Sequence, residues 1–209
     1  MVKKIVGTGV LLVLALALQA GVKMYTLKSP DGKVKLEVTA GQGIAYSLFY
    51  DGRLLLKPSR IALHTDLPEA DHWENIRITG TKQRHVSETV QAPFYRVKEF
   101  GIDCNELELR LNNGFSLLMR AYNDGMAYRF VAGRKGEMTV VEERAEFNFA
   151  DDFEAYIPYS TNPKDPWNMA FQNFYTKAPL TQYNTELPAF LPLTVDAGAV
   201  KLTLLESDL

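Results

Sequence analysis

Cysteine is almost absent from this 209-residue sequence, and its single cysteine, Cys104, excludes any disulfide within the chain. The sequence also lacks a GxSxG nucleophile motif, an HExxH zinc motif, a Gly-rich phosphate loop and an EF-hand loop. Basic charge is not in excess, since the formal net charge is -2, and this argues against a nucleic-acid partner. The fold must therefore depend on its apolar core, in which we expect Cys104 to be a buried, inert thiol.

The first twenty residues differ from the rest of the chain. The short basic start MVKK precedes the apolar run IVGTGVLLVLALAL, which has the length of a signal-peptide core and is short for a bilayer span. We therefore expect a signal peptide over residues 1–20, with cleavage after Ala20. The mature protein, residues 21–209, would then be exported to the periplasm or secreted, without membrane attachment. An uncleaved membrane anchor is the alternative interpretation.

The remaining sequence shows the two-residue alternation of half-buried strands. Leu107, Leu109 and Leu111 alternate with charged neighbours, and similar runs recur between turn signals. Asp51-Gly52 joins two apolar runs and predicts a type I′ hairpin turn. No stretch after the first twenty residues holds a helical period for more than about ten residues. The pattern predicts an all-β, antiparallel sandwich in one domain.

Two segments interrupt the alternation. Residues 64–88 are polar and are predicted to be mainly loop, whereas residues 158–188 are rich in proline and aromatic side chains. Long ordered loops on a β scaffold commonly line a site or pack on another domain. The aromatic side chains of the second segment therefore fit either sugar stacking or domain packing, and they are Trp167, Phe171, Phe174, Tyr175 and Tyr183.

Histidine and acidic residues are the remaining candidates for chemistry. The three histidines are His64, His72 and His85. Two of them could act as general acid and base in sugar-ring opening, or all three could be ordinary surface residues. The acidic residues of the strands are expected to face solvent, namely Glu106, Glu108, Glu142, Glu143 and Glu146. Glu206 differs, because it directly follows the apolar strand VKLTLL. It is either a solvated residue or a group that faces whatever packs beyond the strand.

From residue 25 onward the sequence resembles the N-terminal domain of glycoside hydrolase family 97. The resemblance rests on the order and spacing of the stretches SPDGKVKLEV, IAYSLFYDGRLLLKPS, NDGMAYRF, FQNFYTKAPL and LLESDL. It implies a β-super-sandwich of the galactose mutarotase type that precedes a catalytic (β/α)8 barrel. It further implies an exported, exo-acting enzyme for α-glucosides or α-galactosides, with inverting and retaining members. The catalytic carboxylates would lie in the barrel, so no catalytic residue is expected in this chain.

The resemblance also assigns site residues. Glu206 matches the family glutamate that helps to hold a Ca²⁺ ion, a hard cation that binds six to eight oxygen ligands, with the other ligands supplied by the barrel. Asn173 matches a loop residue near the family's site, although Gln172 stands where an acidic residue is usual. Together with Trp167, Asn173 is expected to contact the oligosaccharide substrate.

Two alternatives remain open at this stage. The chain could be a free-standing exported carbohydrate-binding sandwich that holds a sugar on Trp167, or a mutarotase-like sandwich that uses histidines. If it instead belongs to a barrel enzyme, the barrel-facing surface of the isolated chain would be exposed, and we expect self-association.

Overall fold

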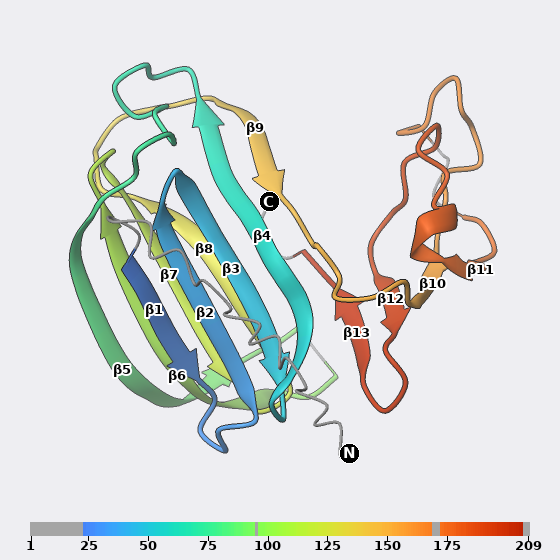
Figure 1. The fold of residues 1–209 in the computed structure, drawn as a ribbon, viewed down its shortest axis with the longest axis horizontal. Coiled ribbons are helices and arrows are strands. Elements are labelled where there is room, and N and C mark those ends of the chain that lie inside the picture. Colours follow the sequence, from blue (N-terminus) through green and yellow to red (C-terminus); the bar gives the residue numbers. More distant parts are fainter. Residues whose placement is uncertain (1–22, 95, 169–171, 207–209) are drawn as a thin grey trace, which may run out of the picture.

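The computed structural model describes residues 23–94, 96–168 and 172–206, so the predicted signal peptide lies outside the described residues. Two antiparallel sheets pack face to face (Figure 1). Sheet A contains, in spatial order, β1 (Lys23–Lys28), β2 (Val34–Gly41), β3 (Gly43–Tyr50), β4 (Arg53–Thr65) and β9 (Val140–Ala145). Sheet B contains β5 (Ile78–Gln91), β6 (Glu99–Leu111), β7 (Phe115–Tyr122) and β8 (Gly125–Ala132).

A third, smaller sheet lies beside the sandwich and is built by the C-terminal segment, residues 154–206 (Figure 1). Its strands are, in spatial order, β11 (Thr176–Pro179), β10 (Glu154–Ile157), β12 (Leu193–Asp196) and β13 (Lys201–Leu204), and the short 3-10 helix η1 (Leu180–Gln182) follows β11. The described residues contain no α-helix, which confirms the predicted all-β sandwich. None of their helices is long and apolar enough to cross a membrane.

The core follows from the alternation seen in the sequence. Buried and half-buried residues alternate along the whole of β2 and β7. The inward-facing residues include Leu36 of β2, Leu109 of β6 and Leu117 of β7, each fully buried between the two sheets. Such a core supplies the dominant favourable term for folding, because apolar area leaves water when the sheets pack.

Two predictions about individual residues are confirmed. Asp51 and Gly52 have φ angles of 48° and 79°, as the type I′ turn between β3 and β4 requires. Cys104 is fully buried, and burial raises the pKa of its thiol, which keeps it protonated and unreactive.

The prediction that residues 64–88 are mainly loop is wrong in part. His64 is the penultimate residue of β4, and the long strand β5 already starts at Ile78. The alternation was missing from the sequence because β5 is an edge strand of sheet B, exposed on both faces along most of its length. An edge strand with few buried positions carries no apolar period to detect.

The prediction that Glu106 faces solvent is also wrong. Glu106 lies on the outer face of sheet B, opposite the leucines of β6, but only 3% of the residue is exposed. Its carboxylate accepts a hydrogen bond from Arg84 Nε of β5 at 2.6 Å and from Arg120 Nε of β7 at 2.8 Å. We call these three side chains the charge ladder, because they cross three adjacent strands of sheet B.

The charge ladder holds Glu106 ionised. Burial opposes the charge, but the hydrogen bonds and positive charges of Arg84 and Arg120 outweigh it and hold the pKa of the carboxyl below its ordinary value of 4.5. A pKa that is lower in the folded than in the unfolded chain contributes stability at neutral pH. That contribution is lost as the pH falls through the folded-state pKa.

We predict that Glu106→Gln lowers the free energy of unfolding by on the order of 2 kcal/mol at pH 7, because two guanidinium groups lose their buried anion while keeping partial access to water. The difference from the wild type should shrink as the pH falls through the lowered folded-state pKa of Glu106, where the carboxylate becomes protonated. Urea unfolding between pH 3 and pH 7 measures both effects. Glu108→Gln, on the same face of β6, is the matched control, and an equal loss in both variants would contradict the ladder.

Candidate functional site

Glu206 is positioned by the hairpin of β12 and β13. Leu193 pairs with Leu204 at the open end of this hairpin, and Gly198, with a φ of 81°, makes its turn. An ion pair between Asp196 and Lys201 closes the turn end. Glu206 follows β13 by two residues and is exposed to solvent.

The charge of Glu206 acts on Tyr128 of β8, at the edge of sheet B. Burial raises the pKa of the Tyr128 phenol, and the nearby Glu143 carboxylate raises it further. Glu206 adds to the same effect, so its carboxylate lies within electrostatic reach of the phenol. The Tyr128 hydroxyl donates a weak hydrogen bond to Glu143 Oε1 at 3.4 Å.

Tyr128 therefore contacts Glu143 and feels the charge of Glu206 where the edge strands β8 and β9 end the two sheets. Carboxylate oxygens are suitable ligands for a hard cation such as Ca²⁺. These carboxylates are the right type of ligand for such an ion, but two of them are too few to hold it. The described ranges contain no group of three or more acidic, histidine or cysteine side chains that could hold a metal. A complete calcium site would need oxygen ligands from elsewhere.

Trp167 lies in the long loop between β10 and β11 and is 75% exposed. Its ring meets the ring of Phe190 edge-to-face, with centroids 6.3 Å apart. Phe174, in the same loop, is 93% exposed. Further exposed apolar side chains of the C-terminal segment are Tyr156, Tyr175, Leu191 and Leu205. We call these six side chains the exposed apolar set, and exposed apolar groups gathered in one segment are typical of a contact surface. Phe171 falls outside the described residues.

Asn173 has a structural role in the same loop. Its Nδ2 donates to the carbonyl oxygen of Tyr159 at 3.0 Å, and its Oδ1 accepts from the backbone N–H of Phe174 at 2.8 Å. The amide therefore ties the loop to the end of β10. The described contacts of Asn173 and Trp167 lie within the C-terminal segment, with Tyr159, Phe174 and Phe190.

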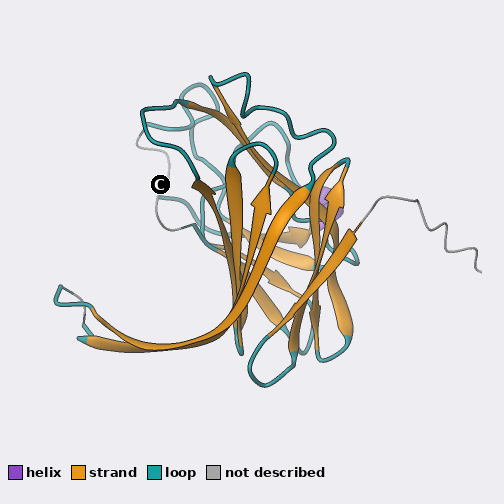
Figure 2. Cartoon of the chain, turned by 90° about the vertical axis from the view of Figure 1, so that its left-hand side faces the viewer, coloured by secondary structure: helices purple, strands orange, loops and turns teal. Residues whose placement is uncertain are grey.

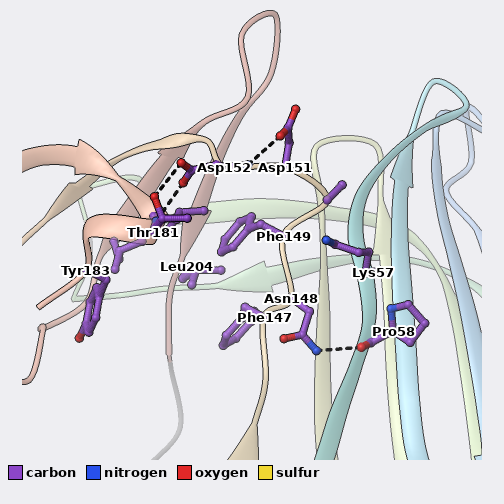
Figure 3. A pocket seen from close by; sticks show the side chains of 13 residues that line it. Lys57, Pro58, Phe147, Asn148, Phe149, Asp151, Asp152, Thr181, Tyr183 and Leu204 are labelled. Atoms are coloured by element: carbon purple, nitrogen blue, oxygen red, sulfur yellow. Dashed lines mark hydrogen bonds between the residues drawn. The ribbon is translucent and has the colours of Figure 1, made fainter. Parts of the chain in front are cut away.

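A cleft of about 900 Å³ separates the sandwich from the C-terminal segment (Figure 3). Phe147 and Phe149 line it from the sandwich side. Its polar groups bind one another, because Asp152 accepts hydrogen bonds from the N–H and the hydroxyl of Thr181 at 2.9 and 2.8 Å. Asn148 likewise donates to the carbonyl oxygen of Pro58 at 2.8 Å. Asp152 and Asn148 are therefore engaged in hydrogen bonds within the protein, which does not favour an acid–base role for them in this cleft.

The histidines lie in separate places. His64 of sheet A contacts Asp71 at 2.7 Å, and His85 of sheet B contacts Asp103 at 3.1 Å. Each ring thus contacts its own carboxylate, and the two histidines lie on different sheets. This arrangement gives no support to a paired general acid and base made from these two residues.

Comparisons with known proteins identify relatives along almost the whole chain. A family model described as Glycosyl-hydrolase 97 N-terminal matches residues 27–209. A retaining alpha-galactosidase of Bacteroides thetaiotaomicron is 40% identical over 201 residues, which are 93% of this chain and 30% of that protein. A probable retaining alpha-galactosidase of Streptomyces bingchenggensis is 26% identical over 158 residues, or 74% of this chain and 24% of that protein. The chain thus spans less than a third of the length of these relatives.

Solved structures share the fold. A beta-arabinopyranosidase crystal structure superposes with a TM-score of 0.69 at 22% identity, covering 82% of this chain and 29% of that one. A glycoside hydrolase family 97 enzyme from Pseudoalteromonas sp. strain K8 gives a TM-score of 0.65 at 20% identity, covering 82% of this chain and 26% of that one. At these identities the likeness supports the fold alone.

We predict that Asn173→Ala lowers the free energy of unfolding by about 1 kcal/mol, because the Tyr159 carbonyl and the Phe174 N–H lose their partner. Trp167→Ala should leave stability nearly unchanged, since most of that ring is already in water. Thermal unfolding of the two variants side by side measures the difference. Equal stabilities would show that the Asn173 amide does not hold the loop.

Proposed function

Because the chain belongs to the family of N-terminal domains of glycosyl hydrolase 97, we propose that it is the sandwich domain of an exported, exo-acting glycoside hydrolase that cleaves α-galactosides. The observation that carries this proposal is the 40% identity to a retaining alpha-galactosidase over 93% of the chain. That identity favours α-galactosides over the α-glucosides that the sequence alone left equally open.

The sandwich would support catalysis without performing it. Retaining glycosidases use two carboxyl groups about 5–5.5 Å apart, one as nucleophile and one as acid and base. We propose that both lie in a barrel that follows this domain, in the two thirds of the relatives that the chain does not span. The exposed apolar set of the C-terminal segment fits this proposal, since the barrel would cover it.

The direct contribution of the sandwich would be Glu206. We propose that its carboxylate is one ligand of a calcium ion, with Glu143 nearby to strengthen the negative field and the other ligands supplied by the barrel. A bound divalent cation supplies a fixed positive charge that can stabilise developing negative charge on a substrate oxygen. Glu206 is suited to this role because it is exposed and follows a strand that is held in register by β12.

One observation favours a second candidate, a carbohydrate-binding module without catalysis. Trp167 offers an aromatic ring to solvent, and such rings stack on sugar faces. Titration of the chain alone with galactose-containing oligosaccharides tests this candidate. Saturable binding that is lost in Trp167→Ala would favour it, whereas no binding would leave the enzyme-domain proposal.

We predict that Glu206→Gln in the complete gene product weakens calcium binding and lowers kcat on an aryl α-galactoside at least tenfold, because one anionic ligand becomes neutral. Calorimetric titration with Ca²⁺ and steady-state kinetics measure the two effects. Glu142→Gln, which removes an exposed charge from neighbouring β9, is the control and should leave both unchanged. Equal calcium affinity in wild type and Glu206→Gln would exclude Glu206 as a ligand.

A further inference from the structure

The distal half of the β5–β6 hairpin extends beyond the sandwich without a third strand. In the described pairing, β7 joins β6 only along residues 104–110, whereas residues 87–91 and 99–103 pair with each other alone. At about 3.4 Å per residue, these five pairs carry the hairpin about 17 Å past the three-stranded part of sheet B. We call the described residues 87–94 and 96–103 the arm, which Figure 2 shows as the curved ribbon that leaves the body of the sandwich.

The base of the arm is fixed on both faces. On the outer face, the charge ladder joins β5, β6 and β7 through the buried Glu106. On the inner face, Asn105 Nδ2 donates to the carbonyl oxygen of Lys28 at 2.8 Å, and Gln83 Nε2 donates to that of Thr26 at 3.1 Å. These bonds attach the hairpin to β1 of the other sheet. The arm is therefore held in one direction at its base.

The tip of the arm presents apolar side chains to water. Phe94 is 101% exposed, Val97 is 52% exposed and Val90 is 41% exposed. Arg96 and Lys98 lie between and beside them, so the tip is both apolar and basic. A two-stranded ribbon is at best marginally stable in water, and exposed apolar groups gathered at its end are typical of a contact surface.

We propose that the arm is a docking element that binds the part of the polypeptide that follows residue 209. This inference rests on the proposed function, since it places that part of the chain against the sandwich. The relatives contain more than two thirds of their length outside the matched region, which is enough chain to cover the arm. The occupant should offer an apolar pocket for Phe94 with acidic groups nearby for Arg96 and Lys98.

The direction of the arm supports this occupant. In Figure 2 the arm bends away from sheet A, so that it forms an L with the outer face of sheet B. A body that packs on the outer face of sheet B would therefore also meet the arm.

A second copy of the chain is a poorer occupant. The free edge of β5 is the natural place for strand pairing between copies. It carries Lys82, Arg84 and Glu88, and charged side chains on edge strands oppose such pairing. Pairing along β5 would also leave the apolar tip at Phe94 outside the paired region, so it would not account for the exposure of that ring.

Amide hydrogen exchange of the native gene product, compared with that of the chain ending at residue 209, tests the proposal. We expect arm peptides to exchange at least tenfold more slowly in the native product. Phe94→Ser should abolish this protection. Met24→Ser, which also replaces an exposed apolar side chain by serine but lies outside the arm, should not. In the 209-residue chain Phe94→Ser should leave the unfolding midpoint unchanged, because the ring already lies in water.

The other outcomes overturn the proposal in distinguishable ways. If the native product is an active α-galactosidase but its arm exchanges as fast as in the 209-residue chain, the docking proposal is contradicted and the proposed function is kept. Protection that grows with protein concentration would assign the arm to a second copy instead. A native product that ends at residue 209 would remove the occupant and the proposed function together. A longer product with a protected arm and no α-galactosidase activity would keep the arm and contradict the proposed function.

Discussion

The packing of sheet A on sheet B is the constraint on which the rest of the structure depends. Alternating leucine, valine and aromatic side chains from the two inner faces leave water together, and this fixes which face of every strand points inward. The outer face of sheet B is then free to carry charge. Glu106 can be buried there only because arginines from the two neighbouring strands meet it.

Two parts of the molecule project from this packed centre, and both display surface that the chain does not itself cover. The C-terminal segment places Glu206 within electrostatic reach of Tyr128 and leaves Trp167 and Phe174 in water. The arm presents its apolar tip about 17 Å beyond the last three-stranded position of sheet B. A domain that supports a larger catalytic body would have these features, since its outward surfaces are completed by that body.

The sequence predicted the strands whose apolar and polar residues alternate regularly. Alternation in β2, β6 and β7 and the turn at Asp51-Gly52 follow from local physics, so the all-β sandwich could be predicted without coordinates. The edge strand β5 could not, because exposure on both faces removes its apolar period. The burial of Glu106 was also hidden, since Arg84 and Arg120 are remote in sequence and become neighbours only through strand pairing. The resemblance pointed to Glu206, whereas its electrostatic effect on Tyr128 could be seen only in the structure.

Calcium-dependent hydrolysis of an aryl α-galactoside by the purified native gene product tests the central claim most directly. If the sandwich is one part of a calcium-dependent α-galactosidase, chelation should abolish hydrolysis, added Ca²⁺ should restore it, and the chain ending at residue 209 should be inactive in both conditions. Full activity in the presence of a chelator, or hydrolysis by the 209-residue chain alone, would contradict the account.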